Sequence, residues 1–69
     1  MIFYATFGYG QRYEGRYVKL EFKSRDKARD RMFDIFKDKW SMIYSEDQWT
    51  LKNGKTQAEE YNLTKLQEL

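Results

Sequence analysis

The chain has 69 residues, enough for one domain with one small core. Its 13 Lys and Arg against 11 Asp and Glu leave a net charge of +2, which is too balanced to predict nucleic-acid binding from charge alone and too positive for an acidic mimic of DNA. The chain has no cysteine and no histidine, which excludes a disulfide framework and all but excludes a structural zinc site. Aromatic residues make up 19% of the chain, and large rings supply the core area that a small domain needs.

The N-terminal residues do not have the pattern of a secretory signal. Residues 1–15 lack both a basic start and a long apolar stretch. No apolar run of the chain approaches the roughly 20 residues that cross a bilayer. We therefore expect no membrane partner and a location in the cytoplasm.

The segment from Ser24 to Trp40 carries the strongest helix signal, and the rest of the chain is organised around it. Ser24 is a predicted N-cap, and Asp26 lies in the first turn, where it complements the helix dipole. One helix face is apolar apart from a lysine at its rim, and it consists of Ala28, Met32, Ile35, Phe36 and Lys39. A helix with a single apolar stripe needs a sheet to cover, so we expect the flanking segments to form that sheet.

Two strands are predicted before the helix. Residues 1–8 are apolar on both faces, which is typical of a central strand, and residues 16–23 alternate like a half-buried antiparallel strand. The side chains predicted to face the helix are Phe3, Ala5, Phe7, Val18, Leu20 and Phe22. Those of the second strand predicted to face outward are Tyr17, Lys19, Glu21 and Lys23.

After the helix, residues 41–44 form a predicted third strand, and residues 45–47 a turn. Residues 48–52 are either a fourth strand or an extended arm, and Asn53-Gly54 is a strong turn signal. These alternatives stay open from the sequence.

A second, short helix is predicted to open with a capping box at Thr56 and Glu59. It either ends at Asn62 or continues towards Leu69. The tail carries three leucines, so we expect it to dock on the domain: Leu63, Leu66 and Leu69.

Together these elements predict a single compact α+β domain over residues 1–69. Its sheet is small and antiparallel, with three or four strands. One long helix packs on one face, and a short helix lies near the C-terminus. The order along the chain is β-β-α-β-(β)-α.

The sequence contains no motif that indicates catalysis. Without histidine and cysteine, acid–base or nucleophilic chemistry falls to carboxylates, lysines or hydroxyls. Gly8, Gly10 and Gly15 precede a strand, whereas a dinucleotide-binding loop leads into a helix N-terminus. Four acidic residues repeat at helical spacing, but basic residues interleave with them, which favours a salt-bridged surface over a metal site: Asp26, Asp30, Asp34 and Asp38. We predict no catalytic residue, no cofactor and no metal.

The loop over residues 8–15 is the candidate binding element. Tyrosines beside an arginine suit recognition, and the same glycines also suit a plain hairpin loop that needs positive φ. Combined with the outward face of the second strand, the candidate contact residues are Tyr9, Arg12, Tyr13, Tyr17 and Lys19. Phe33 and Trp49 are further aromatic residues that the predicted elements leave unburied, unless they pack under the C-terminal tail.

Three functions are compatible with such a surface. Aromatic residues beside arginines are typical of protein interfaces, so the first prediction is a non-catalytic module that binds another protein. The alternative is a single-stranded nucleic-acid-binding or regulatory protein that stacks bases on the second strand, although Glu21 lies in that face. The third is a structural or self-assembling component. The oligomeric state, from monomer to small homo-oligomer, stays open.

Several motifs resemble small proteins encoded in phages and prophages of Gram-positive bacteria. They are TFGYG at 6–10, YVKLEF at 17–22, MF at 32–33, KW at 39–40, IYSEDQW at 43–49 and QAEEYNL at 57–63. The resemblance implies an origin in a phage and a place in the cytoplasm of a bacterial host cell. By analogy with small phage proteins that lack active sites, it implies binding and inhibition of a host protein, such as a CRISPR nuclease or another defence enzyme.

Overall fold

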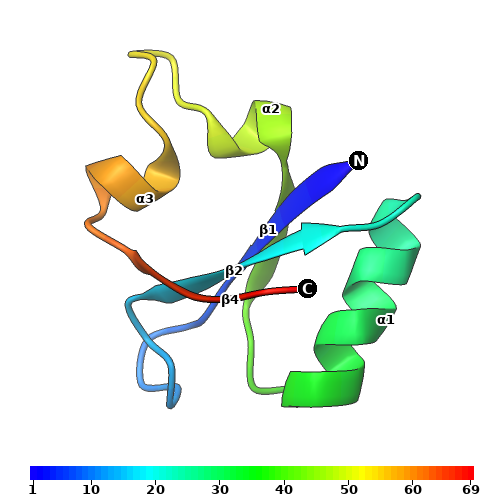
Figure 1. Ribbon diagram of the computed structural model, residues 1–69. Coiled ribbons are helices and arrows are strands. Elements are labelled where there is room, and N and C mark those ends of the chain that lie inside the picture. Colours follow the sequence, from blue (N-terminus) through cyan, green and yellow to red (C-terminus); the bar gives the residue numbers. More distant parts are fainter.

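Four strands form one mixed sheet in the computed structural model, which describes residues 1–69 (Figure 1). The elements are β1 (Ile2–Thr6), β2 (Arg16–Glu21), α1 (Arg25–Phe36), β3 (Met42–Ser45), α2 (Glu46–Trp49), α3 (Gln57–Glu60) and β4 (Thr64–Glu68). The strands lie in the order β3-β1-β2-β4. β1 is antiparallel to β2 and β3, whereas β4 runs parallel to β2. The predicted α+β class is confirmed, but the sheet is mixed rather than wholly antiparallel.

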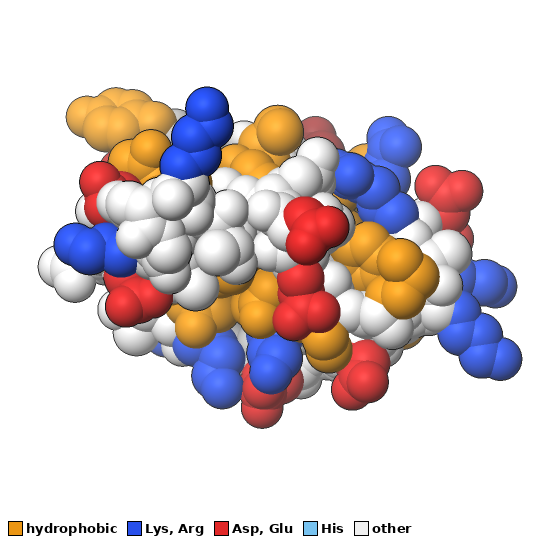
Figure 2. Space-filling view, turned by 90° about the horizontal axis from the view of Figure 1, so that it is seen from above, with side chains coloured by type: hydrophobic (Ala, Val, Ile, Leu, Met, Phe, Trp, Pro, Cys, Tyr) orange, Lys and Arg blue, Asp and Glu red, His pale blue; other side chains and the backbone are white.

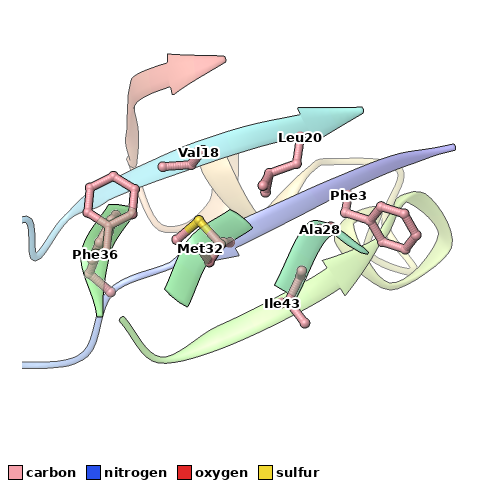
Figure 3. Packing of buried hydrophobic residues seen from close by; sticks show 9 residues of the cluster. Phe3, Val18, Leu20, Ala28, Met32, Phe36 and Ile43 are labelled. Atoms are coloured by element: carbon pink, nitrogen blue, oxygen red, sulfur yellow. The ribbon is translucent and has the colours of Figure 1, made fainter. Parts of the chain in front are cut away.

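α1 covers one face of the sheet with the apolar stripe that its sequence predicts (Figure 3). The strand register places Phe3 opposite Leu20, and Ala5 opposite both Val18 and Ile43, so these side chains point to the same face. The buried cluster consists of Phe3, Ala5, Phe7, Val18, Leu20, Ala28, Met32, Phe36 and Ile43. Phe22 and Ile35, also predicted for this core, are partly buried at its margin.

α1 begins where the sequence predicts and ends earlier. The Oγ of Ser24 accepts a hydrogen bond from the backbone N–H of Lys27, so Ser24 is the N-cap. At the other end, Lys37 has a φ of 59° and ψ of −126°, a conformation that cannot continue a helix. The prediction of a helix as far as Trp40 is therefore wrong.

Trp40 folds back onto α1 after the helix ends. Its indole N–H donates a hydrogen bond of 3.0 Å to the carbonyl of Lys37. Its ring meets the ring of Phe33 edge-on, with the centroids 5.1 Å apart. Lys39 also lies beyond the helix, so it is not part of the helical stripe.

On the opposite face of the sheet, one indole ring packs over a tyrosine from each of β1, β2 and β3. Residues 46–49 form a helical turn, α2, because Ser45 and Gln48 satisfy each other's backbone N–H groups in a capping box. This turn places Trp49 over the sheet, where it is only 3% exposed. Its ring stacks on Tyr4 at 4.6 Å with an interplanar angle of 7°, and lies 5.2 Å from Tyr17 and 5.7 Å from Tyr44. We call Tyr4, Tyr17, Tyr44 and Trp49 the outer aromatic cluster.

The segment after α2 returns along the same side of the sheet, so that α1 lies on one side of the strands and α2 and α3 on the other (Figure 1). Thr50 forms an isolated antiparallel bridge with Thr56, and the predicted turn at Asn53-Gly54 joins them, with Gly54 at a φ of 85°. Residues 48–52 are therefore not a strand of the sheet. The capping box of Thr56 and Glu59 opens α3, as predicted.

The C-terminal residues form a strand rather than a helix. Asn62 adopts a φ of 57°, which ends the helical turn, and β4 then pairs with β2. Leu66 and Leu69 pack against the buried cluster, so the predicted docking of the tail is confirmed. None of the three helices combines the length and the apolar character that a bilayer crossing requires.

Replacing Trp49 with alanine is expected to lower the free energy of unfolding by about 3–5 kcal/mol, because it removes the ring that buries the outer face of the sheet. Tyr61→Ala is the matched control, since Tyr61 is 65% exposed, and is expected to change stability by at most about 0.5 kcal/mol. Chemical denaturation followed by circular dichroism measures both. Equal stabilities of the two variants would contradict the buried position of Trp49.

Replacing Lys37 with glycine is expected to raise the free energy of unfolding by about 1 kcal/mol, because glycine adopts a positive φ without strain. Lys37→Ala is the control, since it removes the same side chain and keeps the Cβ. If alanine stabilises the protein as much as glycine does, the gain comes from the loss of the lysine and not from the backbone.

Candidate functional site

The predicted contact residues of the loop between β1 and β2 have different environments. Tyr9 is 97% exposed, and Arg12 is also exposed. Tyr13 is partly buried, with its ring edge-on to Phe7 at 5.5 Å and to Phe36 at 5.8 Å. Tyr13 therefore packs on the α1 side of the sheet, where its ring extends the core.

Tyr17 and Lys19 lie on the opposite side of the sheet. Tyr17 contacts Trp49, and the ammonium of Lys19 lies 3.7 Å from a carboxylate oxygen of Glu68. The expectation that the five candidate residues share one surface is therefore wrong. Strand alternation fixes Tyr17 and Lys19 on the outer face, whereas the loop turns Tyr13 towards α1.

The loop over residues 8–15 is braced from within. The backbone N–H of Gly8 donates to the side-chain oxygen of Gln11, and that of Gly10 donates to a carboxylate oxygen of Glu14 at 2.9 Å. Gly10 and Gly15 have φ values of 84° and 82°, so the predicted need for positive φ in this loop is confirmed. The loop presents Tyr9 and Arg12 from a defined backbone.

Two exposed apolar side chains, Phe33 and Met42, lie between α1 and β3 beside the partly buried Trp40. We call Arg29, Phe33, Trp40 and Met42 the α1–β3 patch. Phe33 is 43% exposed and Met42 is 50% exposed. A domain of this size has a small core, and burial of these two side chains would enlarge it. The guanidinium of Arg29 lies 5.5 Å from the centroid of the Phe33 ring, within the range of a cation–π contact.

The α1–β3 patch surrounds a shallow hollow of about 450 Å³. Arg25 and Asp26 from α1 and Asp38 from the following turn contribute charged groups at its rim. The hollow is therefore an apolar floor of aromatic rings and a methionine with charges of both signs around it. Aromatic rings, methionine and arginine are enriched at the centres of protein interfaces in general.

A second hollow, of about 820 Å³, lies on the α1 side between the β1–β2 loop and β4. Tyr13 and Phe36 contribute rings, Ile35 and Leu66 contribute aliphatic side chains, and the guanidinium of Arg12 lies 5.3 Å from the Tyr13 ring centroid. Of the five predicted contact residues, only Arg12 and Tyr13 meet here.

Charged side chains of both signs are mixed on one face of the molecule. Figure 2 shows this face, where Lys and Arg are interspersed with Asp and Glu and form no continuous basic patch. The acidic repeat is exposed, with three members in α1 and Asp38 in the turn that follows it, and Arg31 pairs with Asp34 at 2.9 Å. No group of three or more side chains converges as ligands for a metal ion.

No protein-family model matches the sequence, and no curated protein and no solved structure matches it either. The resemblance to phage and prophage proteins thus stays a prediction, and the site rests on the geometry of the chain itself.

The sequence pointed to part of the α1–β3 patch and missed the rest. Phe33 lies outside the predicted apolar stripe, and Arg29 is one turn before it, which are signals of an exposed ring with a cation above it. The sequence did not indicate Trp40 and Met42 as partners of Phe33, because it predicts a helix that continues to Trp40 and a separate strand over residues 41–44. Trp40 contacts Phe33 because the backbone reverses direction at Lys37. No residue pattern in the sequence predicts this reversal.

Replacing Tyr13 with alanine is expected to lower the free energy of unfolding by about 1–3 kcal/mol, because the ring packs against Phe7 and Phe36. Tyr9→Ala, in the same loop, is the matched control and is expected to leave stability unchanged, since Tyr9 is 97% exposed. Thermal unfolding of both variants measures the difference. A Tyr13→Ala variant as stable as the Tyr9→Ala variant would mean that Tyr13 is a surface residue.

Proposed function

We propose that the protein is a non-catalytic binding module of phage origin that attaches to a host protein through the α1–β3 patch and inhibits it by covering part of its surface. The observation that carries this proposal is the ring of Phe33, which is 43% exposed and lies between the partly buried ring of Trp40 and the guanidinium of Arg29. Defence enzymes such as CRISPR nucleases are the class of target that the sequence resemblance suggests.

The composition of the patch supports a protein partner. Phe, Trp, Met and Arg are enriched at the centres of protein interfaces, where they fill pockets and exclude water. An aromatic ring that stays 43% exposed in a chain of this size loses core area that the domain could use. Burial of Phe33 against a partner recovers that area.

The rigidity of the patch supports binding as well. Trp40 is held by its hydrogen bond to the carbonyl of Lys37, and Phe33 sits between Trp40 and Arg29 on the last turns of α1. Side chains that are already fixed lose little entropy when a partner binds, so more of the contact energy appears as affinity.

The alternative of single-stranded nucleic-acid binding requires bases to stack on the outward aromatic face of β2. Tyr17 lies beneath Trp49, so a base cannot stack on it unless Trp49 moves away. On the face that Figure 2 shows, positive and negative side chains are interspersed and form no continuous track for phosphates. A protein partner is therefore the function that the geometry supports best.

An affinity-tagged chain is expected to retain a host protein from bacterial lysate, and to retain it after nuclease treatment and at raised salt. Mass spectrometry identifies what is bound. Loss of every partner on nuclease treatment would favour the nucleic-acid alternative instead, since phosphate contacts weaken steeply with salt.

Phe33→Ala is expected to weaken binding of that host protein about 10- to 30-fold, the effect of a central aromatic contact residue. Its unfolding free energy is expected to fall by about 1 kcal/mol, because the ring is only partly exposed and packs against Trp40, and the variant should remain folded. Tyr61→Ala, an equally large deletion on the other side of the molecule, is the matched control and should leave the affinity unchanged. Equal affinities of the two variants would place the binding surface elsewhere, with Tyr9 and Arg12 as the next residues to replace.

A further inference from the structure

The two edge strands of the sheet, β3 and β4, differ in how their outward backbone groups are hydrogen-bonded. At the β3 edge, the guanidinium of Arg25 donates to the backbone carbonyl of Ile43 and, at 3.3 Å, to the side-chain oxygen of Gln48. β3 has four residues and leads directly into α2. A short strand with a capped carbonyl is a poor template for a further strand.

The β4 edge presents backbone groups that point away from the sheet. The N–H of Thr64 donates to the carbonyl of Gly15, and the N–H of Leu69 donates to the carbonyl of Lys19, so these two residues direct their backbone groups towards β2. Alternation along a strand turns the backbone groups of their neighbours, Lys65 and Glu68, to the free side. Both residues are exposed.

β4 contains an extra residue relative to β2, which accounts for the spacing of the outward groups. The register shifts between Tyr17 and Val18, whose partners are Lys65 and Gln67, so Leu66 is the inserted residue. A bulge normally spoils an edge for pairing with a regular strand. A second copy of β4 carries the same bulge, however. In an antiparallel pair related by a two-fold axis, Leu66 of each copy stands opposite Gln67 of the other, and the two bulges match.

The side chains of β4 are complementary to themselves in this register. Lys65 of each copy lies opposite Glu68 of the other, which forms two cross-strand pairs of opposite charge. Within one chain, the Lys65 ammonium already lies 3.4 Å from a Glu68 carboxylate oxygen, and Lys19 lies 3.7 Å from the same oxygen, so the charges share one face. A strand with two like charges at these positions would repel its own copy.

The hollow beside β4 gives the pairing an apolar component. Leu66 and Gln67 line this hollow together with Ile35 and Tyr13 on the α1 side of the sheet. In the two-fold register, Leu66 of the second copy comes to the rim of the hollow next to Gln67. Each copy therefore covers part of the apolar lining of the other.

We infer that β4 is a self-association surface, through which two copies pair antiparallel about the Leu66–Gln67 step and join their sheets into one. The inference does not depend on the proposed function, because β3 and β4 are opposite edges of the sheet. The α1–β3 patches lie at the outer ends of the joined sheet, where they stay accessible. A dimer of this form presents two copies of the patch and binds a target with repeated sites more tightly than a monomer does.

Sedimentation equilibrium of the purified chain at low salt tests the pairing without any host protein. We expect a monomer–dimer equilibrium with a dissociation constant below about 1 mM, the weak end of specific association. Lys65→Glu places like charges opposite each other twice and should raise this constant at least about ten-fold. The double variant Lys65→Glu with Glu68→Lys restores the opposite charges and should restore dimerisation. Lys52→Glu makes the same change in net charge in an exposed turn and is the matched control.

A backbone readout complements the charge variants. The amide protons of Lys65 and Glu68 should exchange more slowly as the protein concentration rises, while that of Thr64 should be independent of concentration. A chain that is monomeric at about 1 mM overturns the inference, and so does a dimer that Lys65→Glu leaves intact. A dimer that forms as described while Phe33→Ala binds the host protein normally overturns the proposed binding surface alone.

Discussion

The stack of Trp49 on Tyr4 is the interaction on which the rest of this structure depends. α1 covers only one face of the four-stranded sheet. The chain has no second long helix that could cover the other face. The short helices α2 and α3 lie on that face instead, and one indole ring at 3% exposure packs there against three tyrosines. Because the capping box of Ser45 begins α2 directly after β3, the ring arrives over the centre of the sheet.

The use of these aromatic rings in packing determines which surfaces remain for recognition. Tyr4, Tyr17 and Tyr44 are used in the outer aromatic cluster, and Tyr13 is used beside Phe36, so the tyrosine-rich strands are not the exposed aromatic surface of the molecule. The α1–β3 patch and the β4 edge are the two surfaces that the packing of the domain does not cover. They lie at opposite ends of the sheet and have different chemistry, since one is aromatic and the other is a backbone edge with paired charges.

The sequence allowed much of the core to be predicted, because periodicity reports which face of an element is buried. Val18 and Leu20, and likewise Ala28 and Met32, occupy the interior that their spacing predicted. The candidate site was predicted less well. Exposure of an aromatic residue in a strand depends on what covers that strand, and a pattern of alternation cannot say that a distant Trp49 does so. The ring of Tyr13 likewise turns inwards through loop geometry that has no period.

The sequence by itself determined the α+β class, the N-cap at Ser24, the capping box at Thr56, the turn at Asn53-Gly54 and the helix-facing side of the first two strands. These features depend on neighbours within a few residues of one another, and short-range hydrogen bonds and side-chain spacing encode them directly. Only the tertiary structure decided that the tail becomes β4, parallel to β2, and that α1 stops at Phe36. A strand pairing between residues far apart gains its hydrogen bonds and burial from the partner strand, so its own sequence specifies it only weakly.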